Sequence, residues 1–269
     1  MPKKIVSIRN AGSIAAYCPP DLCKALGHLP VSVSSPAPVP FPLSRRPQCA
    51  ACLRPLRACL CHCVHSVLSQ VQLLVLQHPE EAGHAKNTAR LLHLCVQGSQ
   101  LEVGEVFDPA ALQSWLHSPG MAHRPSTNAS VHTVLLYPQT PPDPKLPVLP
   151  PPPLPTDWLT APRTLRLVLI DGTWRKSRKM LYLNPLLQRL PRLALHNVPA
   201  GRYAIRKAHA PDQLSSFEAA ALALAQLQGW TQDSSAWQQL MDSFDAAMRH
   251  HQSLQWTGQT QGFNTDTPR

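Results

Sequence analysis

Short apolar runs alternate along this chain with segments that have helical spacing. The apolar or alternating runs are rich in Val and Leu and predict strands over residues 66–76, 101–106, 131–137, 164–170 and 192–198. Apolar residues at helical spacing, capping residues and Ala-rich composition predict helices over residues 87–96, 109–117, 215–228 and 233–255, and a basic helix from about residue 175. Because strands and helices alternate, we expect an α/β fold with a mostly parallel sheet.

Clustered prolines divide the chain. Eight lie between Pro19 and Pro47, and ten lie in the eighteen residues 138–155. Such clusters favour linkers or polyproline II and are excluded from central strands. We therefore expect a poorly ordered extension over residues 1–47, one domain over 48–258 with a proline-rich surface insertion at 138–158, and a tail at 259–269.

The charge balance is basic, with 25 Lys and Arg against 15 Asp and Glu, a formal net charge of +10. This balance is consistent with a nucleic-acid or nucleotide partner, and equally with a basic soluble enzyme that binds neither. No apolar run approaches the roughly 20 residues of a membrane span, and the N-terminus does not resemble a signal peptide. We therefore expect a cytoplasmic protein with no membrane association.

Five cysteines lie within the fifteen residues 49–63. A C-x2-C pair followed by a C-x-C pair supplies four thiolates for a closed tetrahedral site, which suits structural zinc. Cys63 or His62 can replace Cys61 in this set, and a redox pair, a disulfide cluster or an iron–sulfur site are the competing interpretations. The expected zinc ligands are Cys49, Cys52, Cys59 and Cys61.

An Asp-Gly-Thr-Trp turn follows the most apolar predicted strand. Ligands of open α/β sheets bind beyond the carboxyl ends of the strands, where Asp171 is expected. Gly172 permits a tight turn, and Trp174 offers an aromatic face ahead of the basic helix. The alternative is purely structural: Asp171 or Thr173 caps the helix, and Trp174 packs in the core.

Four blocks of the sequence together resemble the DTW-domain family, in its bacterial form. They are the cysteine segment C-x2-C-x-R-P-x3-C-x-C, the block from Gln77-His78-Pro79-Glu80 to Leu92, the Asp-Gly-Thr-Trp turn, and Tyr203–Lys207 followed by Leu214–Ala219. The blocks occur in the family's order over residues 49–225. The N-terminal extension and the proline-rich insertion depart from the family pattern.

The resemblance implies a SPOUT-like α/β fold, with a knotted chain as an open alternative. It also implies transfer of the 3-amino-3-carboxypropyl group of S-adenosylmethionine to N3 of a tRNA uridine, at position 47, with release of methylthioadenosine. Asp171 is then the candidate catalytic residue, as general base toward the uridine N3–H. Orienting the uridine and contacting the methionine ammonium are rival roles for Asp171.

The resemblance also directs attention to the start of the helix at Ser215. Ser215 and Glu218 fit a capping box, and a capped helix N-terminus is itself a site for anions. The expected cofactor-binding residues are Asp171, Gly172, Thr173, Trp174, Leu214, Ser215, Ser216 and Glu218. The candidate RNA-binding residues, with solvated surface charge as the alternative, are Arg175, Lys176, Arg202, Arg206 and Lys207. Further candidates to line the site are His78, Glu80, Asn87 and Thr88.

Two other functions compete with the transferase. One is an RNA methyltransferase of SPOUT type, and the other is a non-catalytic, zinc-dependent RNA-binding protein. A nicotinamide-dependent enzyme is not expected, because no G-x-G-x-x-G segment follows a predicted strand.

Overall fold

The structure is a computed structural model. It describes residues 47–84, 86–118, 130–139, 141–195, 198 and 214–260, all within one compact unit that spans Arg45–Arg269. Nearly all of the expected extension (residues 1–47) and most of the expected tail (residues 259–269) lie outside the described residues. Within the described part of the chain, no helix has both the length and the apolar character needed to cross a bilayer.

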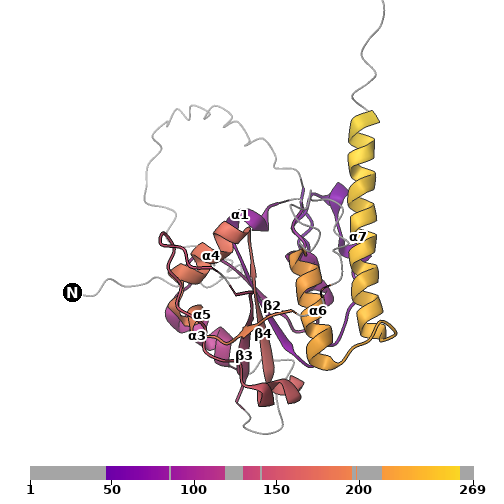
Figure 1. Cartoon of the computed structure of the whole chain (residues 1–269). Coiled ribbons are helices and arrows are strands. Elements are labelled where there is room, and N and C mark those ends of the chain that lie inside the picture. The colour runs from indigo at the N-terminus through magenta and orange to yellow at the C-terminus, as the bar shows by residue number, and fades with distance from the viewer. Residues whose placement is uncertain are drawn as a thin grey trace, which may run out of the picture. The chain divides into compact units, whose positions relative to one another are not determined.

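A five-stranded parallel sheet forms the centre of the domain (Figure 1). Its strands are β1 (Gln72–Gln77), β2 (Gln100–Val103), β3 (His132–Leu136), β4 (Leu165–Asp171) and β5 (Arg192–Leu193). They lie in the order β2-β1-β4-β3-β5, so the two most buried strands, β1 and β4, pair at the centre. Every residue of these two strands is buried, as expected for the inner strands of a sheet covered on both faces.

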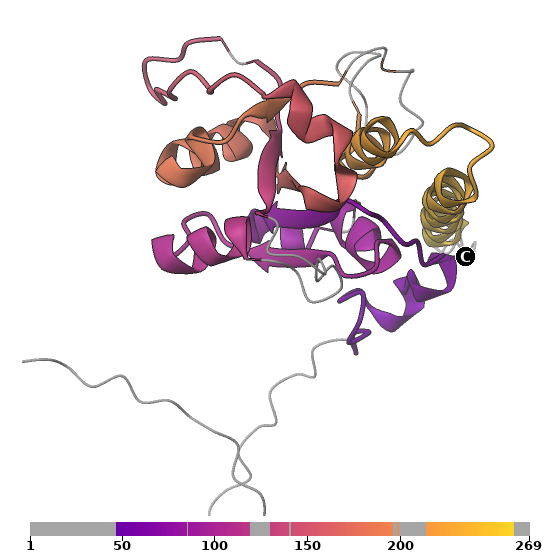
Figure 2. The same ribbon diagram turned by 90° about the horizontal axis from the view of Figure 1, so that it is seen from below.

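Helices cover both faces of the sheet (Figure 2). Alternate residues of the strands divide the core into two clusters. One cluster packs against α2 (Ala89–Cys95), α6 (Ser216–Gln228) and α7 (Ser235–Thr260), and the other against α3 (Pro109–His117), α4 (Trp174–Leu183) and α5 (Pro185–Gln188). The remaining helical segments are α1 (Pro79–Ala82), η1 (Leu56–Ala58), η2 (Cys61–Cys63), η4 (Thr156–Thr160) and η5 (Pro162–Thr164).

The element types agree with the sequence prediction, but some boundaries differ. The first strand is shorter than residues 66–76, because the Ser69 hydroxyl donates to the Val71 carbonyl and the Gln70 amide donates to Gln228 Oε1 instead of a neighbouring strand. Val67 keeps only an isolated bridge to Val96. The last strand contains two residues, and residues 196 and 197 of its expected range lie outside the described residues.

The proline-rich segment is the main part of the crossover from β3 to β4. These strands are parallel, so the chain must return along the sheet, a path that usually contains an α-helix. Here, where described, residues 138–155 contain no helix or strand. Arg178 of α4 anchors them by donating to the carbonyls of Pro141 at 2.8 Å and Leu146 at 3.1 Å. The expected surface insertion is therefore tied to the domain.

The expected α/β class with a parallel sheet is confirmed. The SPOUT-like arrangement and the knot remain predictions, and residues 199–213 lie outside the described residues.

Candidate active site and metal centre

The candidate active site lies at the carboxyl ends of the central strands. Gln77, the last residue of β1, is paired in register with Asp171, the last residue of β4. The His78 amide donates to the Asp171 carbonyl at 2.9 Å and joins the two chain segments just beyond the sheet. The structure therefore places Asp171 at the edge where open α/β sheets bind ligands, as predicted.

The Asp171 carboxylate is buried and held by three side chains. Its Oδ2 accepts from Asn87 Nδ2 at 2.6 Å and Gln77 Nε2 at 2.9 Å, and its Oδ1 accepts from Ser216 Oγ at 2.6 Å. Only 4% of Asp171 is exposed. These hydrogen bonds fix the orientation of the carboxylate. The donors come from β1, the loop before α2, and α6, so Asp171 joins three separate segments.

A cavity of about 490 Å³ opens beside Asp171, between the carboxyl ends of β3, β4 and β5 and the N-termini of α4 and α6. Its volume lies within the usual range of small-molecule sites. Most lining residues are apolar. Of the predicted cofactor-binding residues, the following line the cavity: Gly172, Thr173, Trp174, Leu214, Ser215 and Ser216. Asp171 and Glu218 lie behind this lining and hold Ser216 and Ser215 in place.

Both helix N-termini at the cavity carry the caps that the sequence indicates. Thr173 Oγ1 accepts from the Lys176 amide at the start of α4. Ser215 and Glu218 form a complete capping box at the start of α6. Trp174 is 57% exposed and contacts the Tyr137 ring edge-on, so the alternative that it packs in the core is wrong. The cavity therefore receives the positive ends of two helix dipoles.

Tyr137 belongs to this site, although sequence reasoning did not select it. It directly follows β3, lines the cavity, and its hydroxyl lies 3.1 Å from Ser177 Oγ of α4. Burial raises the pKa of Tyr137, so the ring remains a neutral phenol at physiological pH. The signal was present, because a residue that follows a predicted parallel strand reaches the same edge as Asp171.

The polar residues near β1 act behind the cavity. Asn87 and Gln77 bond Asp171, and Thr88 Oγ1 accepts from the Phe217 amide at 3.3 Å. His78 instead bonds Glu105, and Glu80 forms an ion pair with Lys176. Sequence reasoning placed Gln77 in a family block without giving it a role, because contacts between residues 94 positions apart depend on the fold.

The predicted RNA-binding residues on α4 differ in their surroundings. Arg175 is exposed and makes no hydrogen bond or ion pair with any described residue. Lys176 Nζ instead pairs with Glu80 at 2.9 Å and with Glu81 at 2.8 Å, and these carboxylates raise its pKa. The other three candidates, Arg202, Arg206 and Lys207, lie outside the described residues.

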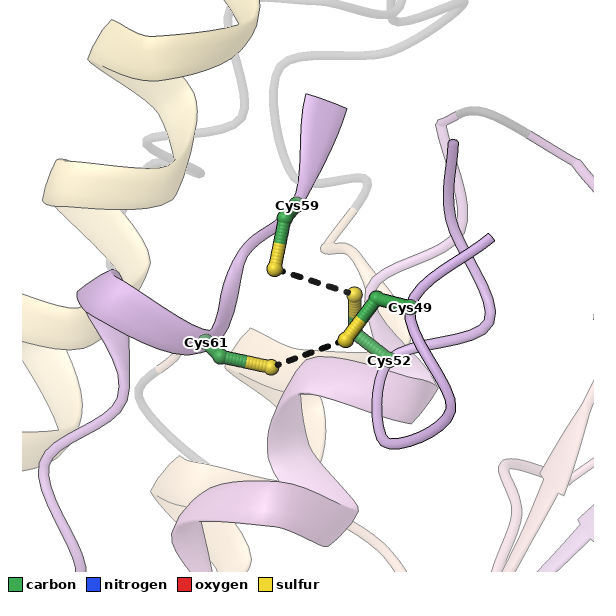
Figure 3. A group of neighbouring side chains, drawn as sticks. All are labelled: Cys49, Cys52, Cys59 and Cys61. Carbon is green, nitrogen blue, oxygen red and sulfur yellow. Dashed lines mark hydrogen bonds between the residues drawn. The ribbon is translucent and has the colours of Figure 1, made fainter. Parts of the chain in front are cut away.

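The four predicted metal ligands come together at one point (Figure 3). All four sulfurs lie within 4.8 Å of one another, and the Cys49–Cys61 and Cys52–Cys59 pairs are 3.6 Å and 3.7 Å apart. A tetrahedron with Zn–S bonds of about 2.3 Å has edges of about 3.8 Å. These distances fit a tetrahedral metal, and they exceed the roughly 2.05 Å of a disulfide.

The peptide around Cys49 prepares this site for a cation. Hydrogen bonds from the backbone N–H groups of Cys52 and Ala51 lower the pKa of the Cys49 thiol to about 6. Burial, together with the neighbouring Cys49, raises the pKa of Cys61 to about 12. A bound metal would displace that proton, because metal binding deprotonates thiol ligands. Of the alternative ligands, Cys63 is 2% exposed in the core, and the His62 ring packs against His250.

Arg54 connects the cysteine segment to the site at Asp171. Its guanidinium Nη2 donates to the Asn87 carbonyl at 2.8 Å, and the Asn87 side chain bonds Asp171. Arg54 lies within the metal-binding segment, two residues after Cys52. Sequence reasoning missed this connection, because it joins residues 33 positions apart that share no local pattern.

Comparisons with known proteins agree with this geometry. A family model described as DTW domain matches residues 46–252, which include both the cysteine segment and the Asp171 turn. No solved structure gives a significant match.

Several curated proteins are similar to this chain. The tRNA-uridine aminocarboxypropyltransferase 2 of Drosophila melanogaster is 34% identical over 197 residues, which cover 70% of this chain and 69% of that protein. The protein of the same name from Macaca fascicularis is 27% identical, over 81% of this chain and 66% of its own length. The tRNA-uridine aminocarboxypropyltransferase A of Arabidopsis thaliana is 27% identical, over 51% of both proteins. These three are not bacterial, so the expected bacterial type is not confirmed. From the family match and the Drosophila relative together, the chain belongs to the DTW-domain family.

Proposed function

We propose that this protein is a tRNA-uridine aminocarboxypropyltransferase that uses S-adenosylmethionine as donor. One observation carries the proposal: the Asp-Gly-Thr-Trp turn and the capped start of α6 enclose a cavity at the carboxyl edge of the sheet. Relatives that cover most of this chain bear the name of that activity.

The cavity suits the donor in size and in chemistry. Its 490 Å³ volume and apolar walls favour burial of an adenosine moiety. The methionine tail ends in a carboxylate, which the N-termini of α4 and α6 can attract. The donor also carries a sulfonium and an ammonium, and the buried carboxylates of Asp171 and Glu218 behind the lining favour positive charge there. We propose that the lining residues Gly172, Thr173, Trp174, Leu214, Ser215 and Ser216 contact the cofactor.

The reaction forms one bond and breaks one. Uridine N3 attacks the γ carbon of the methionine side chain, which is attached to the sulfonium sulfur. The bond between this carbon and sulfur breaks, and its electrons leave with methylthioadenosine. The N3 proton passes to a base. Proximity and alignment supply much of the acceleration of such a step. The protein must therefore hold this carbon, rather than the methyl group, toward the RNA.

Asp171 remains the candidate catalytic residue, and its hydrogen bonds define what that role requires. Three donors occupy three of the roughly four lone-pair positions of its carboxylate, and the open position is on Oδ1, which accepts from Ser216. The Ser216 hydroxyl is the donor that lies at the cavity. We therefore favour a pathway in which the N3 proton passes to Ser216 Oγ while the Ser216 hydroxyl proton passes to Asp171 Oδ1, so that the Asp171 carboxylate is the final proton acceptor.

We further propose that Cys49, Cys52, Cys59 and Cys61 hold structural zinc, which supplies a fixed tetrahedral junction and no chemical step. The sulfur distances support this assignment. The parallel sheet supports a SPOUT-like fold, and the family membership supports tRNA as the acceptor, at a uridine that we propose is position 47.

Mass spectrometry of nucleosides tests this proposal. Unmodified tRNA is incubated with the protein and S-adenosylmethionine and then digested. We expect 3-(3-amino-3-carboxypropyl)uridine together with methylthioadenosine. Methyluridine with S-adenosylhomocysteine would instead identify a methyltransferase. A folded, zinc-loaded sample that binds tRNA without forming any product would identify a non-catalytic RNA-binding protein.

A further inference from the structure

A basic surface lies where the cysteine segment meets α7. We define the cysteine-segment surface by exposed residues from the cysteine segment, the loop before α2, and α7: Arg57, His62, His65, Lys86 and Arg249. No acidic residue occurs in residues 47–79 or 246–260, the stretches that flank most of this surface. Part of the protein's net charge of +10 thus lies here, and the nearest acidic residues in the sequence are Asp245, four positions before Arg249, and Glu81, five positions before Lys86.

Side-chain contacts hold the two parts of this surface together. α7 packs against η1 and η2, and Figure 1 shows the indigo cysteine segment beside the yellow α7. His65 bonds Ser243 of α7 through its backbone amide at 2.9 Å and its ring at 3.1 Å. The rings of His62 and His250 meet edge-on, with centroids 4.6 Å apart. Folding therefore fixes the position of the surface before any partner binds.

The two arginines of this surface resemble Arg175 of α4, which is also exposed and unpaired among the described residues, and differ from the other three cations of that helix. Lys176, Arg178 and Lys179 each pair with a carboxylate. Arg57 and Arg249 are exposed and make no hydrogen bond or ion pair with any described residue. Four thiolates around zinc would leave a net charge of about −2 beneath them, while Arg54, Arg57, Lys86 and Arg249 supply four positive charges. The surface therefore stays positive.

Arg54, in the same segment as Arg57, connects this surface to the candidate active site. Arg54 of the same segment donates to the Asn87 carbonyl at 2.8 Å, and the Asn87 side chain donates to Asp171 at 2.6 Å. A polyanion on the surface would thus run within a few side chains of the carboxyl edge of the sheet. Exposed guanidinium groups bind phosphate oxygens in a bidentate manner and are suited to a nucleic-acid backbone.

We propose that the cysteine-segment surface binds the phosphate backbone of tRNA, with Arg57 and Arg249 as its main contacts. The inference rests on the proposed function for its choice of RNA. It assigns the metal-binding segment a role in substrate docking, in addition to its role in the fold.

The test measures tRNA binding without catalysis. Filter binding of an unmodified tRNA transcript is measured over a range of salt concentrations for wild type and for Arg57→Ala/Arg249→Ala. We expect roughly tenfold weaker binding at moderate salt and a salt slope reduced by about 2, since each lost phosphate contact removes about 1. Zinc content and S-adenosylmethionine affinity should match wild type.

Arg163→Ala is the matched control. Arg163 is equally exposed and unpaired among the described residues, but it directly precedes β4 at the opposite, amino edge of the sheet. Its loss should leave tRNA affinity and the salt slope almost unchanged. A loss in the Arg163→Ala variant of about half that in the double variant, on a logarithmic scale, would overturn the proposal, because one lost charge against two would then account for both effects.

A charge-preserving variant covers the case in which the double alanine variant loses zinc or unfolds. Arg57→Lys/Arg249→Lys keeps the positive charges but not the bidentate geometry, so it should recover the wild-type salt slope and part of the affinity. Failure to recover the salt slope in a zinc-loaded sample would also overturn the proposal. A protein that binds tRNA through this surface but forms no modified uridine would refute the proposed activity and leave the surface in place.

Discussion

The metal centre and the active site of this protein are assembled over very different distances in sequence. Cys49 and Cys61, whose sulfurs lie 3.6 Å apart, are separated by 12 positions. The donors to Asp171 are 94, 84 and 45 positions away, on β1, before α2 and on α6. A short segment therefore supplies the metal centre almost alone, whereas the active site exists only when the sheet and α6 are in place.

Because of this difference, we expect the metal centre and the active site to contribute differently to stability and to activity. The metal centre stabilises a local fold, and losing a ligand should remove the metal and much of the segment's structure. The active site orients a charge, and losing one donor should reduce activity while leaving the fold largely intact. Among the described residues, Arg54 connects the metal centre to the active site. Variants in each of the two regions therefore show whether a change in one alters metal binding or activity in the other.

The largest effect is expected for Cys52→Ser. Cys52 is 4% exposed, and its sulfur lies 3.7 Å from that of Cys59. Zinc content should fall from about one per chain to near zero. Stability should fall by at least ~3 kcal/mol, because structural zinc contributes on the order of 10 kcal/mol in small domains. Metal analysis and thermal unfolding measure both quantities.

Cys63→Ala is the matched control, because Cys63 is buried in the same segment but lies outside the four-sulfur group. It should keep its zinc and lose about 1–2 kcal/mol of stability from the small cavity that it leaves. If the Cys63→Ala variant lost its zinc while the Cys52→Ser variant kept a full complement, the proposed set of four zinc ligands would be wrong.

Asp171→Asn should have the next largest effect. The substitution keeps the shape of the side chain but removes the charge that Gln77, Asn87 and Ser216 surround. We expect product formation to fall by ~10²-fold or more, since such positioned groups typically contribute ~10²–10⁴-fold. Zinc content should stay at the wild-type level. The control is Asp143→Asn, in the proline-rich segment, which should change the rate less than about twofold. A fully active Asp171→Asn enzyme would exclude this residue from the reaction.

Ser215 and Ser216 offer a sharper contrast between fold and function at one helix end. Ser216→Ala removes a hydrogen bond of 2.6 Å to a carboxylate, a type that contributes roughly 1.5–3 kcal/mol. We expect a loss of stability of that order together with an about tenfold or greater loss of kcat/KM. Ser215→Ala removes the helix cap and should mainly cost about 1 kcal/mol of stability. Kinetics and denaturant unfolding of both variants check the contrast, and a reversed pattern would refute it.

The smallest effect is expected for Arg54→Met. The change breaks the hydrogen bond to the Asn87 carbonyl, worth about 1 kcal/mol, and should lower S-adenosylmethionine affinity about fivefold while zinc is retained. Arg57→Met, in the same segment, should leave this affinity unchanged, because Arg57 has no described bond toward Asp171. Calorimetry without RNA distinguishes the two. Identical affinities would mean that the metal centre and the active site are energetically independent.

The sequence predicts the metal centre better than the active site for the same physical reason. The spacing of the cysteines alone limits which sulfurs can meet, and the structure brings the predicted four together. Strand periodicity and the turn residues also predict the sheet and place Asp171 at its edge. Gln77 and Arg54 have no comparable local signal, because their contacts depend on how distant segments pack, whereas the place of Tyr137 at the end of a predicted strand was a signal that sequence reasoning did not use. Proline content indicated an insertion at 138–158, but only the sheet shows that the segment is a crossover.

The measurement that tests the account most directly follows two parts of the donor at once. S-adenosylmethionine carries one label on its methyl group and a different label on its carboxyl carbon, and the tRNA is separated from small molecules after the reaction. We predict that the carboxyl label enters the tRNA while the methyl label leaves with methylthioadenosine. Methyl label in the tRNA, with the carboxyl label left in the small-molecule fraction, would contradict it.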